Sequence, residues 1–136
     1  MSDQSKYIWF NGKIVPWDNA QIHVMSHVLH YGSGVFEGIK CYATEKGPAI
    51  FRLDDHIYRL FESGKKYGIQ IPFSEENIID ASIQIVRLNG FESCYIRPIA
   101  FYGYDTLGVH PKDCPVEAAG ASFFWGAYLG DEGLEN

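Results

Sequence analysis

The segment formed by residues 27–38, which reads HVLHYGSGVFEG, constrains the fold of this chain more than any other. It carries three glycines, Gly32, Gly34 and Gly38, and runs into a segment of alternating side chains at residues 35–42. Because glycine has no Cβ, it allows positive φ and the close approach of another group to the backbone. Such a turn feeding a strand indicates a backbone shaped to accommodate another group, and the alternative is a tight turn that ends in a strand glycine.

Short β-rich runs dominate the rest of the chain. The dipeptide Asn11-Gly12 between Tyr7–Phe10 and Lys13–Pro16 is a strong signal for a two-residue hairpin. Further strands are expected at residues 35–42, 49–52, 93–102 and 116–128, with a weak extended segment at 21–25. A turn at residues 46–48 is expected to join the strands 35–42 and 49–52 into a second hairpin.

Two helices are expected between these strands. In the first, apolar residues recur at helical spacing after Asp54, the expected N-cap, up to Gly68 at the C′ position. The second begins after Ser74, a good N-cap residue, and ends at Asn89-Gly90. This order predicts an α+β fold, an antiparallel or mixed sheet with two helices packed on one face. Rossmann and P-loop folds are excluded, because both need a glycine-rich turn that opens a helix.

The composition fits one ordinary globular domain. The chain has 136 residues, of which 46% are hydrophobic, so it is long enough for a core and is not a disordered chain. Its formal net charge of −6 argues against a surface for nucleic acid or anionic membranes. No apolar stretch approaches the roughly 18 residues of a membrane span. The N-terminal residues lack the apolar region of a signal peptide.

The cysteines and histidines predict neither a disulfide framework nor a metal site. The three cysteines, Cys41, Cys94 and Cys114, are scattered and odd in number. Cys41 and Cys94 lie in strand-like runs and are interpreted as small buried hydrophobic side chains. His27 and His30 are close in sequence, but no cysteine or carboxylate cluster accompanies them. We therefore expect a protein of the reducing cytoplasm.

Side chains of the segment 35–42 alternate between the two faces of the expected strand. One face is apolar except for a single carboxylate, and consists of Val35, Glu37, Ile39 and Cys41. The other face consists of Phe36, Gly38, Lys40 and Tyr42. An aromatic, a glycine and a charge together are typical of a ligand-facing surface, with room for a ligand above Gly38. The alternative is an amphipathic strand with Lys40 in solvent.

Two arginines are candidates for binding anions. Arg59 lies early in the first helix, and an arginine suits phosphate because its guanidinium donates two parallel charge-assisted hydrogen bonds. The alternative for Arg59 is a surface pair with Asp55 one helical turn away. Tyr95 and Arg97 share one face of the strand 93–102, and a hydroxyl beside a guanidinium makes a carboxylate receptor. The alternative is a strand-edge arginine whose stem covers aromatic rings.

Three segments together, residues 27–38, 51–60 and 125–130, resemble the class IV fold of pyridoxal-phosphate enzymes, and branched-chain amino-acid aminotransferases match best. The likeness runs from Tyr7 to Leu134. It implies that residues 1–130 are the small N-terminal domain and that 131–136 begin the interdomain linker. It also implies that the C-terminal domain, with the family's Schiff-base lysine, lies beyond Asn136.

The resemblance implies a reaction and its partners. The full-length enzyme would use pyridoxal phosphate to transfer the amino group of Leu, Ile or Val to 2-oxoglutarate, and this chain alone would be inactive. Its partners would be amino acids, 2-oxo acids and its own C-terminal domain, in a homodimer or higher homo-oligomer, without nucleic acid or membrane. Of the seven lysines, Lys40 lies in the expected strand 35–42, and its motif position differs from that of the family's lysine.

The resemblance also implies roles for individual residues. Arg59 occupies the position of the family's phosphate-contacting arginine, the one cofactor contact assigned to this domain. Arg97 occupies the position that binds the distal carboxylate of glutamate. The remaining substrate-pocket positions are Phe36, Gly38, Tyr95, Trp125, Tyr128, Tyr31 and Val109. Tyr31 and Val109 would reach the pocket of the neighbouring subunit. The family often has arginine at the position of Lys40, whose role stays open.

Three alternatives remain. Without the resemblance, Trp125 and Tyr128 are interpreted as core aromatics. Another class IV member, a D-amino-acid aminotransferase or an aminodeoxychorismate lyase, usually has Gly-Asp-Gly where this chain has Gly32-Ser33-Gly34, and lacks the paired histidines. A free-standing, non-catalytic binding domain is the alternative of a different class, motivated by the missing lysine.

Overall fold

The computed structural model describes residues 5–124 and confirms the α+β fold. Its sheet has the strand order β2-β1-β7-β6-β4-β5, with β3 also paired to β6, and each of these pairings is antiparallel. The strands are β1 (Tyr7–Phe10), β2 (Lys13–Pro16), β3 (Gly34–Phe36), β4 (Ile39–Thr44), β5 (Gly47–Ile50), β6 (Cys94–Tyr102) and β7 (Val116–Phe123). The helices are η1 (Trp17–Asn19), α1 (His27–Tyr31), α2 (Leu53–Lys66) and α3 (Glu75–Asn89).

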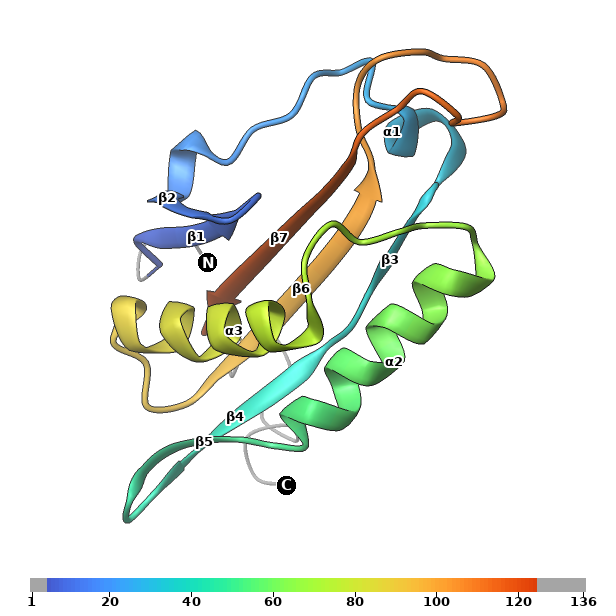
Figure 1. Ribbon diagram of the computed structural model, residues 1–136. Helices are drawn as coiled ribbons and strands as arrows, with labels where there is room; N and C mark the ends of the chain where they lie inside the picture. Colours follow the sequence, from blue (N-terminus) through green and yellow to red (C-terminus); the bar gives the residue numbers. More distant parts are fainter. Residues whose placement is uncertain (1–4, 125–136) are drawn as a thin grey trace, which may run out of the picture.

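Both longer helices, α2 and α3, cover the same face of the sheet (Figure 1). The core between the layers contains Ile39 of β4, Ile96 of β6, Ile57 of α2 and Ile85 of α3, each with 0% of its surface exposed. Because alternate side chains of a strand point to opposite faces, burying this face leaves the other set of side chains on the open face. That open face carries several of the predicted site residues.

Cys41 and Cys94 lie in this core, directly opposite each other on β4 and β6, and both are buried as predicted. Burial, with Cys41 alongside, raises the pKa of the Cys94 thiol to about 12. Burial also raises the pKa of the Cys41 thiol. Because the thiolate is the reactive form, these cysteines act as packing groups and not as nucleophiles.

The hairpin predicted at Asn11-Gly12 is confirmed. Both residues have positive φ, 50° and 91°, which a two-residue turn of the primed type requires. The second predicted hairpin is also present, since β4 and β5 pair antiparallel, but its turn lies earlier in the chain than predicted. Gly47 pairs with Thr44, so β5 already begins at Gly47, and Pro48 lies within it. An edge strand tolerates proline because its outer side has no ladder partner, and β5 is such an edge.

The strand predicted at residues 35–42 is interrupted between β3 and β4. Its register on β6 is nevertheless continuous, since Phe36 pairs with Ile99 and Ile39 pairs with Ile96. Glu37 therefore faces Pro98, whose carbonyl accepts the Glu37 N–H at 3.1 Å. Proline has no N–H to return, so the ladder breaks here while the alternation of side chains is kept.

Four local predictions need correction. Residues 27–31 form the short helix α1, and not only a turn, with Gly32 ending it at φ 64°. Asp54 is not the N-cap of α2, because the helix begins one residue earlier and Arg52 precedes it in the left-handed conformation, at φ 51°. The segment 21–25 forms no strand. The strand predicted at 116–128 ends at Phe123, and its last four residues lie outside the described part of the chain.

The other helix ends agree with the predictions. Gly68 follows α2 at φ 71°, and Gly90 ends α3 at φ 72°. Ser74 caps α3 through a reciprocal pair of hydrogen bonds, because the Asn77 N–H donates to the Ser74 hydroxyl at 3.1 Å and the Ser74 N–H donates to the Asn77 side chain at 3.0 Å.

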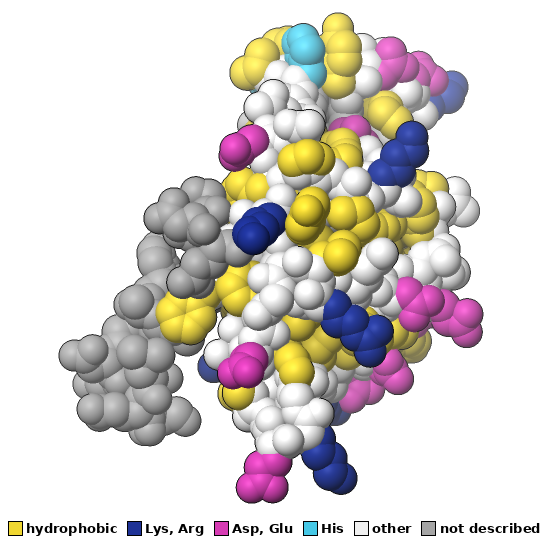
Figure 2. Space-filling model, turned by 90° about the vertical axis from the view of Figure 1, so that its left-hand side faces the viewer, with side chains coloured by type: hydrophobic (Ala, Val, Ile, Leu, Met, Phe, Trp, Pro, Cys, Tyr) yellow, Lys and Arg dark blue, Asp and Glu magenta, His cyan; other side chains and the backbone are white. Residues whose placement is uncertain are grey.

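Charged side chains of both signs are spread over the surface, with exposed hydrophobic side chains between them on the face that Figure 2 shows. Val24 and Val109 are among the most exposed hydrophobic residues, at 70% and 78%. Within residues 5–124, no helix is both long enough and apolar enough to cross a lipid bilayer.

Candidate functional site

Three consecutive residues at the β3–β4 junction divide the candidate site between the two faces of the sheet. Glu37 points toward the helices and is buried, whereas Phe36, at 57% exposure, points to the open face. Gly38 follows on the same face as Phe36. The apolar and mixed faces predicted for this segment are therefore confirmed, and the carboxylate on the apolar face has partners on α2.

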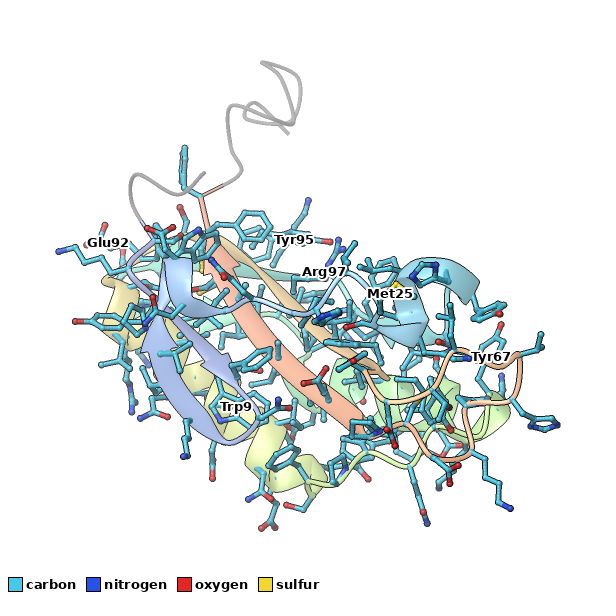
Figure 3. The ribbon with its side chains drawn as sticks, turned by 90° about the horizontal axis from the view of Figure 1, so that it is seen from above. Trp9, Met25, Tyr67, Glu92, Tyr95 and Arg97 are labelled. Atoms are coloured by element: carbon cyan, nitrogen blue, oxygen red, sulfur yellow. The ribbon has the colours of Figure 1, made fainter. Side chains whose placement is uncertain are left out.

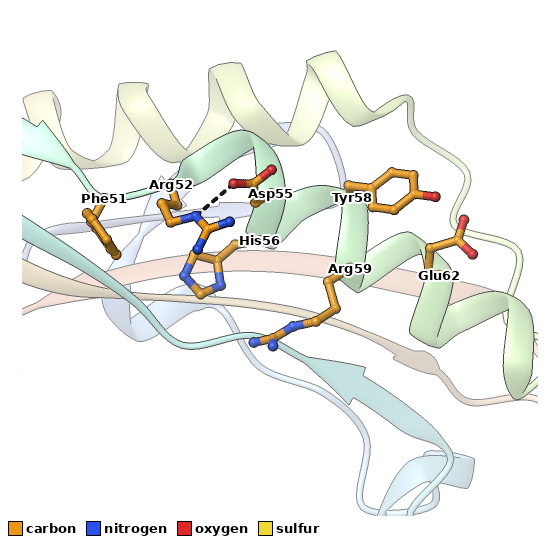
Figure 4. Close-up of a pocket in the computed structure, with 7 residues that line it drawn as sticks. All are labelled: Phe51, Arg52, Asp55, His56, Tyr58, Arg59 and Glu62. Carbon is orange, nitrogen blue, oxygen red and sulfur yellow. Dashed lines mark hydrogen bonds and ion pairs between the residues drawn. The ribbon is translucent and has the colours of Figure 1, made fainter.

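The first cluster is an ion-paired network between Glu37 and α2. The Arg59 guanidinium donates to the Glu37 carboxylate through Nε, at 3.0 and 3.2 Å, and through Nη2, at 2.8 Å. His56 contributes a third donor, with its Nδ1 at 2.8 Å from the same carboxylate. His56 and Arg59 lie three residues apart on α2, so they project from the same side of the helix, as Figure 4 shows.

These donors determine the charge of Glu37. Burial of the carboxyl raises its pKa, while the hydrogen bonds and charges of Arg59 and His56 lower it. The lowering is the larger effect, so the pKa of Glu37 lies below its ordinary value and the group is ionised at neutral pH.

The alternative role of Arg59, a pair with Asp55, is not what the structure shows. Asp55 instead accepts a hydrogen bond from Arg52 Nε at 2.8 Å (Figure 4). An open groove of about 520 Å³ runs along this part of α2, and both His56 and Arg59 line it. Arg59 thus contacts a buried carboxylate on one side and a solvent-filled groove on the other.

Arg59 retains the donors that a phosphate needs. A guanidinium has five N–H groups, and the Glu37 carboxylate occupies the side formed by Nε and Nη2. The two N–H groups of Nη1 and the outer one of Nη2 have no partner within residues 5–124. The Arg59 side chain is 67% exposed, so these donors are accessible. The residue therefore fits a phosphate ligand.

The second cluster lies on the open face of the sheet. The Arg97 guanidinium carbon stands 4.3 Å from the centroid of the Phe36 ring. Arg97 Nη2 also donates to the Tyr95 hydroxyl at 3.2 Å. Figure 3 shows Tyr95 and Arg97 on the side of the sheet away from α2 and α3. The structure thus brings Phe36, Tyr95 and Arg97 together, and two aromatic rings border the Arg97 guanidinium.

Gly38 lies beneath this cluster. A Cβ placed on it would overlap the Tyr95 hydroxyl and stand 2.7 Å from the Tyr95 ring carbon Cζ. We expected a ligand in the space above Gly38, but the hydroxyl of Tyr95 already occupies it. Glycine at this position therefore lets Tyr95 lie flat against the strand, beside Arg97. Lys40 is exposed and pairs with Tyr95 across β4 and β6.

The third cluster joins α1 to the loop between β6 and β7. The Tyr31 hydroxyl donates to the Leu107 carbonyl at 2.8 Å. His27 Nε2 lies 2.8 Å from the Gly108 carbonyl, and His27 Nδ1 lies 2.7 Å from the Ser33 hydroxyl. A carbonyl only accepts, so Nε2 carries the hydrogen and, in the neutral ring, Nδ1 accepts from Ser33.

This third cluster brings together two further predicted residues. Tyr31 and Val109 line the same cavity of about 520 Å³, at the end of the sheet where α1 and the loop meet. Both are exposed, Tyr31 at 46% and Val109 at 78%. The structure does not bring this pair to Arg59, which lies with Glu37 on the helix side of the sheet. Trp125 and Tyr128 lie outside the described residues.

Sequence reasoning missed the partners of Glu37. The carboxylate on an apolar face was one signal, and the spacing of His56 and Arg59 on one side of α2 was the other. Together they predict a buried acid satisfied by two donors from a neighbouring helix. Among the described residues, no group of three or more histidine, cysteine or acidic side chains is arranged to hold a metal ion.

Comparison with known proteins identifies the family of this chain. The family model "Amino-transferase class IV" matches residues 34–130. The branched-chain-amino-acid aminotransferase of Pseudomonas aeruginosa is 45% identical over 135 residues, which cover 99% of this chain and 44% of that protein. The enzyme of the same name from Escherichia coli K12 is 46% identical over 133 residues, 97% of this chain and 43% of that protein.

Solved structures point to the same family. A crystal structure of the Escherichia coli branched-chain amino acid aminotransferase superposes with a TM-score of 0.90 at 46% identity, covering 94% of this chain and 42% of that chain. A branched-chain amino acid aminotransferase from T.th., complexed with N-(5'-phosphopyridoxyl)-L-glutamate, superposes with a TM-score of 0.88 at 49% identity. The superposition covers 92% of this chain and 42% of that chain. The chain therefore spans less than half the length of the relatives that it matches.

Proposed function

Because the chain belongs to the class IV aminotransferase family, we propose that it is the N-terminal domain of a branched-chain amino-acid aminotransferase. Relatives with that name are 45–46% identical across nearly all of this chain, which supports the proposal. The chain spans 43–44% of their length, as a single domain would. In this proposal residues 1–130 form the domain, and residues 131–136 begin the linker to a C-terminal domain with the cofactor lysine.

The proposed reaction moves the amino group of Leu, Ile or Val to 2-oxoglutarate with pyridoxal phosphate as cofactor. The bound cofactor would supply the electron sink for the carbanion chemistry, while the protein binds and orients it. A complex of one relative with N-(5'-phosphopyridoxyl)-L-glutamate supports both the cofactor and an acidic amino donor. Arg59 is the proposed phosphate contact, since its outer N–H groups are exposed and without partners within residues 5–124.

One observation carries the proposed substrate specificity. The Arg97 guanidinium lies on the Phe36 ring and beside the Tyr95 hydroxyl, so one surface offers aromatic carbon and a positive charge together. An aliphatic side chain would contact the rings, and the distal carboxylate of glutamate would pair with the guanidinium. Such a surface accepts both branched-chain and acidic substrates, which the proposed reaction requires. In this proposal Trp125 and Tyr128 are further residues of the substrate pocket.

The proposed enzyme is a homodimer or higher homo-oligomer of the cytoplasm. Tyr31 and Val109 would reach the pocket of the neighbouring subunit. Their exposure, 46% and 78%, and their shared cavity at one end of the sheet support a role at such a boundary. The hydrogen bond from Tyr31 to the Leu107 carbonyl would then orient both residues at once.

The test uses the protein expressed from its complete reading frame. We expect it to form glutamate from 2-oxoglutarate with leucine, isoleucine or valine, and only when pyridoxal phosphate is bound. Transfer from D-alanine but not from these three amino acids would overturn the assignment in favour of another class IV activity. A complete protein that transfers no amino group from either set would support a binding domain instead.

A second arm uses the 136-residue chain itself. We expect no amino-group transfer and no stoichiometric covalent adduct with pyridoxal phosphate after borohydride reduction, because the proposed lysine lies in the other domain. Mass spectrometry of the reduced chain gives the result. A single modified lysine, Lys40 above all, would overturn the division of labour between the two domains.

A further inference from the structure

The pairing of Arg59 with Glu37 raises the question of what a buried acid does next to a phosphate-binding residue. We infer that Glu37 is a positioning residue, whose carboxylate holds the Arg59 guanidinium from one side so that the opposite pair of N–H groups forms a ready-made phosphate site. This inference rests on the proposed function, because the phosphate is that of the proposed cofactor.

The hydrogen-bond geometry supports this role. Glu37 contacts Nε and Nη2 of Arg59, which are the two donors on one edge of the guanidinium. A second edge, formed by Nη1 and the outer hydrogen of Nη2, presents two parallel N–H groups in the same plane. Carboxylates and phosphates both bind such edges in bidentate fashion. One arginine can therefore hold Glu37 and a phosphate at the same time.

Glu37 is itself held firmly. It is 5% exposed, and it lies at the β3–β4 junction, where its N–H donates to the Pro98 carbonyl at 3.1 Å. His56 Nδ1 binds the same carboxylate at 2.8 Å and keeps it from rotating. The anchor of Arg59 is thus a buried group on the central part of the sheet, and not another flexible surface side chain.

The benefit of the anchor is entropic. Arg59 is 67% exposed, and a free arginine of this kind samples many rotamers that a ligand must select from. Fixing the guanidinium before the ligand arrives removes that cost from binding. The negative charge of Glu37 acts in the opposite direction, because it partly neutralises Arg59 and repels a phosphate. We infer that the positioning effect is the larger, since Glu37 occupies only one edge of a guanidinium that also lines an open groove.

The experiment measures the contribution of the phosphate group alone. Using the complete protein without cofactor, the affinities for pyridoxamine 5′-phosphate and for pyridoxamine are measured by fluorescence titration, and their ratio is taken. We expect Glu37→Gln to lower this ratio about tenfold while the affinity for pyridoxamine stays unchanged. Glu37→Asp, which keeps the charge but shortens the side chain, should also lower it. Arg59→Ala should lower the ratio at least as much as Glu37→Gln does.

A matched control removes an equal charge elsewhere. Glu92 is exposed in the turn before β6, so Glu92→Gln changes the net charge by the same amount as Glu37→Gln. The ratio should be unchanged in this variant. In the Arg59→Ala background, adding Glu37→Gln should have no further effect on the ratio, because a positioning residue acts only through the residue that it positions.

The outcomes distinguish the proposed phosphate contact of Arg59 from the positioning role of Glu37. If Arg59→Ala leaves the ratio unchanged, the cofactor contact of the proposed function is wrong. If Arg59→Ala lowers the ratio but the Glu37 variants do not, the proposed contact stands and the inference is overturned. A ratio that rises in Glu37→Gln also overturns it, because the charge of Glu37 would then outweigh its anchoring.

A measurement on the unaltered chain covers the case in which the Glu37 variants do not fold. In nitrogen-15 NMR spectra without cofactor, rotation about the Cζ–Nη bonds is slow for a guanidinium held on both Nε and Nη2. We expect separate, slowly exchanging Nη signals for Arg59 and averaged signals for Arg87, which is exposed on α3. Averaged Nη signals for Arg59 would overturn the inference.

Discussion

The hydroxyl of Tyr95 lies so close to the Cα of Gly38 that a Cβ at position 38 would overlap it. A backbone position that must be glycine thus sets the position of a side chain on the open face. Tyr95 in turn accepts a hydrogen bond from Arg97 Nη2 at 3.2 Å. The lack of a side chain at position 38 therefore affects the position of Arg97, the proposed carboxylate receptor.

Gly38→Ala is therefore expected to displace the Tyr95 ring. Forcing an extra methyl into an occupied space costs about 1–3 kcal/mol, and urea unfolding of the chain measures this loss. Gly120→Ala is the control, because a Cβ there meets no heavy atom within 4 Å. Its stability should not fall, because the added methyl group meets no neighbouring heavy atom within 4 Å.

The double variant Gly38→Ala with Tyr95→Phe tests the cause. Removing the hydroxyl removes the nearest overlap, but the ring carbon Cζ remains 2.7 Å from the new methyl group. We expect a partial recovery of the free energy of unfolding, relative to the sum of the two single variants. Purely additive effects would mean that Gly38 matters for its backbone and not for Tyr95.

Glu37 predicts how stability depends on pH. Burial alone would raise its pKa, but the hydrogen bonds and charges of Arg59 and His56 outweigh burial and lower the pKa in the folded protein below its ordinary value of 4.5. A lowered pKa contributes stability that is fully present above the unfolded pKa and is lost as pH falls through the folded pKa. The stability difference between the wild type and Glu37→Gln should therefore be largest near neutral pH and shrink below pH 4.5.

Chemical denaturation of both proteins at a series of pH values measures this difference. Glu92→Gln serves again as the charge-matched control, because Glu92 is exposed. A wild-type advantage that stays constant down to about pH 3, well below the ordinary pKa of 4.5, would contradict the ion-paired state of Glu37.

The hydrogen bonds of His27 are expected to keep the loop between β6 and β7 closed. It is 1% exposed, and its ring connects Ser33 to the Gly108 carbonyl. His27→Phe fills the same space but removes both hydrogen bonds, so the loop should open more often. Trypsin cleavage after Lys112, an exposed lysine in that loop, should become roughly tenfold faster, equivalent to about 1.4 kcal/mol of local stability.

Two controls test whether the effect of His27→Phe is confined to the loop. His110→Gln alters an exposed histidine within the loop itself and should leave the cleavage rate after Lys112 unchanged. Cleavage after Lys13 in β2 should be unchanged in both variants. If Lys13 and Lys112 become equally sensitive in His27→Phe, the histidine stabilises the whole domain and not this loop.

Local patterns predicted which way side chains point, and they failed where the answer depends on a distant residue. The alternation at residues 35–42 correctly separated Phe36 from Glu37, because the pleat of a strand is a local property. The break after Phe36 depends on Pro98, which faces Glu37 only once the strands have paired. No pattern within residues 35–42 contains that information.

The same limit applies to the ends of elements and to ion pairs. Ser74 could be recognised as an N-cap because its side chain satisfies a backbone donor three residues away. Arg52 could not, since it precedes α2 at positive φ without capping it through its side chain. The local alternative for Arg59 is a partner one helical turn away, at Asp55. The partner in the structure is Glu37, brought close only when α2 packs on the sheet.

Arg97 should distinguish acidic from branched-chain substrates in the complete enzyme. Its guanidinium lies 4.3 Å from the centroid of the Phe36 ring, where it can pair with a distal carboxylate that an aliphatic substrate lacks. A charge-assisted hydrogen bond to a carboxylate contributes about 1.5–3 kcal/mol. Arg97→Ala should therefore lower kcat/KM for glutamate and 2-oxoglutarate about tenfold to a hundredfold, with a much smaller loss for leucine.

Steady-state kinetics with both substrate classes decides between a receptor and a structural role for Arg97. Arg87→Ala removes an equal charge from the exposed surface of α3 and should leave the ratio of the two specificity constants unchanged. The Nε atom of Arg97 is buried without a hydrogen-bond partner within residues 5–124, so its removal also relieves an unsatisfied donor. That relief acts on both substrate classes equally and cannot produce a selective loss. Equal losses for glutamate and leucine would mean that Arg97 holds Phe36 and Tyr95 in place, and its assignment as the carboxylate receptor would then be withdrawn.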